Sequence, residues 1–92
     1  MSRREKWQKV LDSEVAHWSA MSWEKLATEV REVRAYQVEL ESRQYQVEVQ
    51  LLENRDDYVH VSVSVDNGSL LGFMLPLTHS FIKRKSIHDR ST

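Results

Sequence analysis

The sequence predicts an α+β domain of two layers, in which two N-terminal amphipathic helices pack on one face of a four-stranded antiparallel β-meander. Two observations predict this fold. Before residue 34, apolar residues recur at the spacing of one face of a helix. After it, apolar and polar residues alternate, which is typical of strands with one buried and one solvated face. A one-sided sheet needs a cover, and the two helices supply it.

The first helix is expected over residues 3–19. Ser2 and Glu5 have the spacing of a capping box, in which each side chain accepts a hydrogen bond from the backbone N–H of the other residue. The apolar stripe of this helix consists of Trp7, Val10, Leu11, Val15 and Trp18. Ser22 is the expected N-cap of a second helix over residues 22–31, whose stripe consists of Trp23, Leu26, Ala27 and Val30. A single helix that bends between the two segments is the alternative.

Four strands are expected, over residues 34–41, 44–52, 58–65 and 69–75. A two-residue turn at Ser42-Arg43 joins the first two strands and places Leu40 opposite Tyr45. A slip of one residue would move all the apolar side chains of a strand into water, so the hydrophobic pattern determines which side chains share a face.

The second and third strands are expected to meet at a turn centred on Arg55, which places Leu51 opposite Val59. For the third connection we expect a three-residue loop over 66–68, with Gly68 in the left-handed conformation. A two-residue Asn-Gly turn is the alternative. The longer loop is favoured because it brings the apolar residues of the fourth strand onto the buried face, namely Leu71, Phe73 and Leu75.

The chain after Pro76 has a weaker pattern. Pro76 has no backbone N–H to donate, which suits a strand end or an edge strand. The following segment is open to three interpretations: a short helix, a final strand or a tucked loop. Residues 1–85 are expected to form a single domain, and residues 86–92 a polar flexible tail.

The composition excludes several classes of protein. The chain has 92 residues, a formal net charge of −1 and no cysteine, so disulfides, thiolate metal sites and thiol nucleophiles are excluded. No apolar run approaches the length of a membrane span, and the N-terminus is polar. We therefore expect a cytoplasmic protein without a membrane anchor and without a cofactor.

Motifs for catalysis are missing. The four histidines show no metal-binding spacing, there is no Gly-x-Ser-x-Gly element, and two glycines do not make a phosphate-binding loop. The sequence therefore predicts no catalytic, cofactor-binding or metal-binding residue and no enzyme. A small-ligand or enzymatic site around Glu48 and His60, with Gln50 opposite His60 on the outer sheet face, is an alternative. An ordinary polar sheet face explains the same residues.

The basic residues near the C-terminus are Lys83, Arg84 and Lys85, and they are candidate phosphate contacts. A weak nucleic-acid binder is therefore an alternative function. Stacking aromatic residues do not interleave with this cluster, so a solvated segment is the favoured interpretation and nucleic acid is not the expected partner.

The segment from Leu70 to Leu77 is unusually apolar. Once the core residues are assigned, Leu70 and Met74 point outward, near Leu52 and Tyr58. An edge strand with apolar side chains on both faces is covered by its own chain, by a second copy or by another protein. The leading hypothesis is a non-catalytic protein-interaction or assembly module that uses this edge and the adjoining outer face, with a homodimer as one form.

Overall fold

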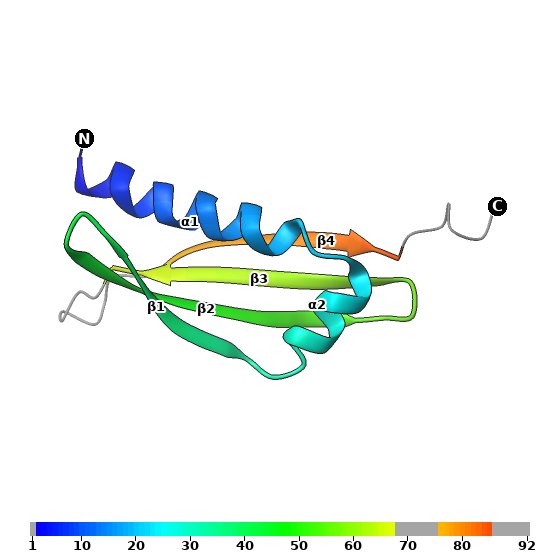
Figure 1. Ribbon diagram of the computed structural model, residues 1–92. Coiled ribbons are helices and arrows are strands. Elements are labelled where there is room, and N and C mark those ends of the chain that lie inside the picture. Colours follow the sequence, from blue (N-terminus) through cyan, green and yellow to red (C-terminus); the bar gives the residue numbers. More distant parts are fainter. Residues whose placement is uncertain (1, 68–75, 86–92) are drawn as a thin grey trace.

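The computed structural model describes residues 2–67 and 76–85, and it shows an α+β fold with a four-stranded antiparallel sheet. In chain order the elements are α1 (Arg3–Ser19), α2 (Trp23–Glu29), β1 (Arg34–Leu40), β2 (Arg43–Asn54), β3 (Tyr58–Asp66) and β4 (Leu77–Arg84). The strands lie in the order β1-β2-β3-β4. α1 runs along the sheet over β3 and β4, and α2 lies at the end where β2 turns into β3 (Figure 1). The predicted fold class is confirmed.

Both predicted helix starts are confirmed by their caps. Ser2 Oγ accepts from the Glu5 N–H at 3.1 Å, and Glu5 Oε1 accepts from the Ser2 N–H at 3.0 Å. Ser22 Oγ accepts from the Lys25 N–H at 3.1 Å and begins α2. This second cap divides the segment into two helices, so the alternative of one bent helix is not observed. α2 is shorter than predicted and ends at Glu29.

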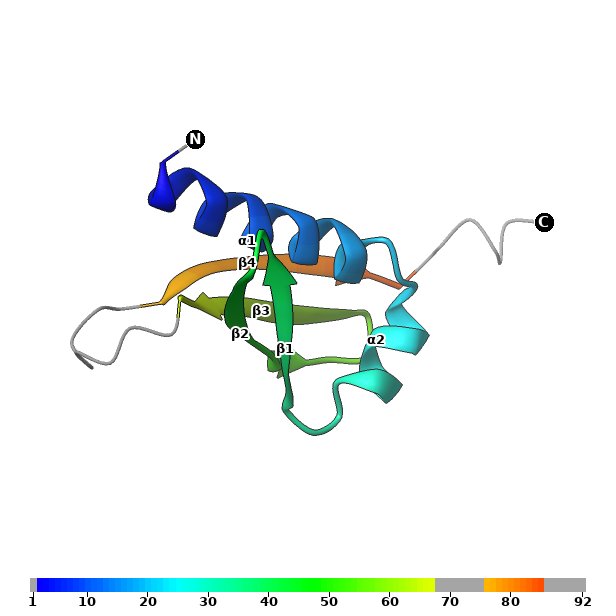
Figure 2. The same cartoon turned by 60° about the vertical axis from the view of Figure 1, so that its left-hand side comes forward.

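The turn between β1 and β2 consists of Glu41 and Ser42 rather than the predicted Ser42-Arg43. Both residues have positive φ, 52° and 68°, as in the two-residue turns whose twist matches that of the flanking strands. Val38 therefore lies opposite Tyr45, two residues from the predicted register. Because side chains alternate with a period of two, this shift leaves the apolar residues on the predicted face. The tip of the hairpin reaches α1 in both views (Figure 1, Figure 2).

The turn between β2 and β3 lies at Asp56-Asp57 rather than at Arg55. A backbone hydrogen bond of 2.9 Å between the two flanking residues closes it. This turn alone would move the register by three residues, and the β-bulge at Leu52 reverses one of them, so Leu51 faces Val61, two residues from the predicted partner. Because the net shift beyond the bulge is two residues, the apolar side chains stay on the predicted face.

A β-bulge interrupts β2 at Leu52. The extra residue changes the alternation of the strand, so that Glu53 lies opposite His60. The prediction that Gln50 opposes His60 is wrong, because Gln50 pairs with Ser62. The bulge thus places a carboxylate beside the histidine.

The fourth strand, which pairs with β3, is Leu77–Arg84. The prediction gave this place to residues 69–75, which lie outside the described residues. Among the interpretations of the segment after Pro76, the final strand is the one observed. On the helix-facing side His79 pairs with Val63, yet His79 is exposed. The helices cover this edge of the sheet incompletely, so polar side chains are tolerated there. The strict alternation of apolar and polar residues that reveals the inner strands is therefore absent from β4.

Several predictions lie outside the described residues. They concern the loop at Gly68, the buried positions of Leu71, Phe73 and Leu75, and the tail over 86–92. Within the described ranges, no helix is long and apolar enough to cross a membrane.

The core lies between the helices and the two inner strands. α1 contributes Trp7, Val10, Leu11 and Trp18, the second helical segment contributes Leu26 and Val30, and β2 and β3 contribute Tyr45, Val47, Val49, Val59, Val61, Val63 and Val65. The indole N–H of Trp7 donates to the Val65 carbonyl oxygen at 2.7 Å and joins the start of α1 to the end of β3. The apolar residues of β1 and β4 are only partly buried, so both edges of the sheet remain accessible.

Candidate functional site

β4 forms one edge of the sheet, and its ladder shows which backbone groups point outward. The Lys85 N–H donates to the Asp57 carbonyl oxygen at 2.8 Å, which makes this a hydrogen-bonded pair. In an antiparallel ladder such pairs alternate with non-bonded ones, so the odd-numbered residues bond to β3. The even-numbered residues direct their N–H and C=O groups away from β3, and no strand of the described part pairs with them. These residues are Thr78, Ser80, Ile82 and Arg84.

A shallow hollow lies between α1 and the helix-facing side of β4. It has a volume of about 190 Å³ and is lined by Asp12, Val15, Ala16 and His79. On the outer face of the same strand, the side chain of Ile82 is 52% exposed. The edge therefore offers backbone groups, a hollow on one face and an apolar side chain on the other.

A cluster of polar side chains lies on the outer face at the end of the sheet near the bulge. Tyr58 OH donates to Glu53 Oε1 at 3.1 Å, and Arg55 Nη2 lies 3.3 Å from Glu53 Oε2. His60 Nδ1 lies 4.0 Å from Glu53 Oε1. The guanidinium of Arg84 lies over the Tyr58 ring at 6.0 Å. Glu53 is thus already engaged by its neighbours, and it raises the pKa of the Arg55 guanidinium.

The structure brings together residues that the sequence placed in different surfaces. Tyr58 was predicted for the interaction surface and Arg84 for phosphate contacts, and they touch across β3 and β4. Leu52, at the bulge of the same hairpin, is 50% exposed. Ile82 pairs with His60, two residues from the pair of Tyr58 and Arg84, and the sequence did not assign it to either surface. Leu70 and Met74 lie outside the described residues.

The three predicted phosphate contacts do not converge. Lys83 pairs with Val59 on the helix-facing side, whereas Arg84 lies on the outer face. The ammonium of Lys85 lies 5.2 Å from the Trp23 ring. Lys83 and Lys85 thus lie on the helix-facing side and Arg84 on the outer face, so the three cations do not share one face of the sheet.

Glu48 and His60 are also separated. Glu48 pairs with Ser64, four residues along β3 from His60, which corresponds to about 13 Å. Among residues 2–67 and 76–85, no group of three or more His, Asp or Glu side chains is placed to hold a metal ion.

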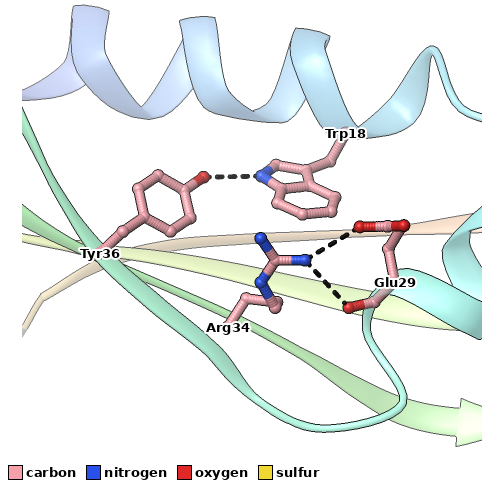
Figure 3. Close-up of polar contacts among 4 residues, drawn as sticks. All are labelled: Trp18, Glu29, Arg34 and Tyr36. Atoms are coloured by element: carbon pink, nitrogen blue, oxygen red, sulfur yellow. Dashed lines mark hydrogen bonds and ion pairs between the residues drawn. The ribbon is translucent and has the colours of Figure 1, made fainter.

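A second polar cluster lines a cleft between α1, α2 and β1. Its volume is about 550 Å³. Trp18 Nε1 donates to Tyr36 OH at 2.8 Å, and Tyr36 OH donates to the Glu14 carboxylate. Arg34 Nη1 donates to Glu29 Oε1 at 3.0 Å and to the Glu29 carbonyl oxygen at 3.3 Å (Figure 3). Three elements are joined by these side chains.

The electrostatics of this cleft favour a structural role. Burial and the hydrogen bond to Glu14 raise the pKa of Tyr36, so the phenol keeps its proton at neutral pH. Glu29 neutralises Arg34, whose guanidinium lies 5.8 Å from the Trp18 ring. The sequence placed Trp18 and Tyr36 in the core but did not identify the polar contacts between them. The helical spacing of Glu14 and Trp18 puts them on one face of α1, and this was the available signal.

No family model matches the chain, and comparisons with curated proteins and with solved structures also find no match. The sheet edge and the two polar clusters are therefore the features from which a function can be inferred.

Proposed function

We propose that this protein is a non-catalytic protein-interaction module that binds an extended segment along the open edge of β4 and the adjoining outer face. The observation that carries the proposal is the row of outward backbone groups on a regular eight-residue edge strand. An added strand gains main-chain hydrogen bonds from such an edge, and its alternate side chains supply specificity.

The edge carries few of the features that block strand addition. Proteins protect their edge strands with bulges, prolines, short lengths or covering segments. β4 pairs with β3 without a register shift and has no proline within Leu77–Arg84. Its basic residues lie at one end, which leaves the stretch from Thr78 to Ile82 without a fixed charge.

A non-catalytic role is supported by the state of the polar groups. In the cleft, Tyr36 is held protonated and Arg34 is paired with Glu29. On the outer face, Glu53 is engaged by Tyr58 and Arg55. In both arrangements the polar groups are bonded to one another, and neither presents an activated nucleophile.

Ser80→Pro tests the proposal, with Ser80→Ala as the matched control. The N–H of Ser80 points outward, so proline removes a group needed by an added strand and spares the hydrogen bonds to β3. The molar mass across a concentration series and capture from extracts of the native host should be compared for wild type and both variants. We expect wild type and Ser80→Ala to show the same association, and Ser80→Pro to lose it. Equal association of all three folded proteins would overturn the proposal.

A further inference from the structure

We infer that the segment added to β4 belongs to another protein, and that it is acidic opposite Arg84, apolar opposite Ile82 and small and apolar on the helix-facing side. This inference rests on the proposed function, because it specifies the chemistry of the strand that the edge receives.

The edge formed by β4 is positively charged at its C-terminal end. From Leu77 to Lys85 the chain carries three basic residues, one histidine and no acid. Arg84 and Lys85 lie against the rings of Tyr58 and Trp23, at 6.0 and 5.2 Å. Within the described ranges neither forms an ion pair with a carboxylate. Of the nearby carboxylates, Glu53 is bonded to Tyr58 and Arg55. Asp57 pairs with Lys85 through the backbone, and within the described residues its side chain forms no ion pair with Arg84 or Lys85. Within the described residues, no ion pair therefore neutralises the positive charge at this end of the edge.

A second copy that pairs through its own β4 does not supply that charge. In an antiparallel pairing of two β4 strands centred on Phe81, Arg84 of one copy meets Thr78 of the other. Lys83 likewise meets His79. None of these side chains is an acid. In a strand with Glu or Asp opposite Arg84, the Cα atoms of the two residues lie about 5.5 Å apart. At that spacing the carboxylate reaches the guanidinium and forms an ion pair.

The two faces of the edge differ in what else they accept. On the outer face, Ile82 lies two residues before Arg84 and is exposed, so an apolar side chain opposite it buries surface on both strands. On the helix-facing side, the hollow beside Val15, Ala16 and His79 has a volume of only about 190 Å³. That space accommodates a small apolar side chain such as Val or Ala against Val15 and Ala16.

The test uses two capped heptapeptides. One has the sequence Glu-Val-Ile-Val-Thr-Val-Thr, which in antiparallel pairing places Glu opposite Arg84, Ile opposite Ile82 and Val on the helix-facing side, and the other has Lys in place of Glu. Binding is followed by the amide NMR shifts of the protein, in which the outward N–H groups of Thr78, Ser80, Ile82 and Arg84 should respond most. We expect the Glu peptide to bind about tenfold more tightly than the Lys peptide, with an affinity that falls as salt is added. Arg84→Glu should reverse this preference, and Ser80→Pro should abolish binding of both peptides.

The outcomes separate the two proposals. Equal binding of both peptides at β4 overturns the acidic class and leaves the interaction module standing. Failure of both peptides, together with a dimer that Ser80→Pro dissociates, identifies a second copy as the occupant and also overturns the inference alone. If neither peptide binds and the protein is a monomer at every concentration, the inference is overturned. If, in addition, host extracts yield no partner whose capture is lost in Ser80→Pro, the interaction module is overturned as well. Circular dichroism of Ser80→Pro and Arg84→Glu verifies that each variant is folded.

Discussion

The hydroxyl of Tyr36 accepts a hydrogen bond from a buried donor, the indole N–H of Trp18. Its oxygen accepts the indole N–H of Trp18 at 2.8 Å, and its proton is donated to Glu14. The Trp18 side chain is only 3% exposed, so water does not replace this acceptor. A buried donor without a partner costs about 1–3 kcal/mol. The phenol therefore links α1 to β1 at a point where a smaller or apolar residue would leave the indole unpaired.

Tyr36→Phe should lower the free energy of unfolding by about 1–3 kcal/mol, because it removes the acceptor of the Trp18 N–H. Denaturant unfolding followed by tryptophan fluorescence measures the change. Glu14→Gln is the control, since it keeps the Tyr36 hydroxyl and an acceptor oxygen, and it should cost less. A neutral Tyr36→Phe would show that the hydrogen bond is dispensable.

The same hydroxyl makes stability depend on pH at the alkaline end. Burial and the hydrogen bond to Glu14 raise the pKa of Tyr36 above its usual value of 10.0. As the pH rises through about 10, the unfolded chain releases the phenolic proton while the folded chain retains it. Stability that is fully present below this pH is therefore lost above it. Between about pH 9 and about pH 11 the unfolding free energy should fall more steeply in wild type than in Tyr36→Phe; parallel curves would contradict this.

Residue identity predicted the burial of Trp18 and the inward position of Tyr36, but not the contact between them. Both carry an apolar ring that fits a core stripe. Their hydrogen bond depends on how β1 lies relative to α1, which is a matter of tertiary placement. Arg84 and Tyr58 show the same limit, because their contact follows from the register of two hairpins.

At the scale of elements, prediction succeeded where one face of the element is buried. The alternation in β1, β2 and β3 located these strands and their inner faces, although both turns were misplaced. An error of two residues in the register is invisible to a period-two pattern. The bulge at Leu52 was missed, and β4 was only one of three interpretations of its segment. Both lie where the pattern weakens, at an irregularity and at an incompletely covered edge.

The turn between β1 and β2 offers a stabilising substitution. Ser42 has a φ of 68°, a region that glycine reaches without the steric cost of a Cβ atom. Ser42→Gly should raise the free energy of unfolding by about 0.5–1 kcal/mol. It leaves intact the ion pair of 3.1 Å between Lys6 Nζ and Glu41 Oε1, which joins the same turn to α1. Thermal unfolding measures the change, and Ser42→Ala, which retains the Cβ atom, should show no gain.

At the scale of the whole molecule, the two helices and the inner strands share one core. α2 is short, and its buried residue is Leu26, which is fully enclosed. An isolated helix of this length is not stable in water, so α2 owes its structure to this contact. Loss of this contact should therefore destabilise the whole domain rather than α2 alone.

Leu26→Ala should lower the free energy of unfolding by about 2–5 kcal/mol through lost burial and a residual cavity. Fluorescence and far-ultraviolet circular dichroism should report the same midpoint, as expected for a cooperative domain. Thr28→Ala, on the exposed side of α2, is the control and should change little. Two separate transitions in the variant would show that α2 unfolds independently of the sheet.

The hydrogen bond from the Trp7 indole to the Val65 carbonyl oxygen spans 58 positions of the sequence. During synthesis on the ribosome, the first helix therefore emerges long before its partner in β3 exists. Until Val65 has left the exit tunnel, Trp7 and its neighbours on the stripe have no sheet to pack against. The synthesis of β3, rather than that of α1 itself, therefore determines when the N-terminal helix docks.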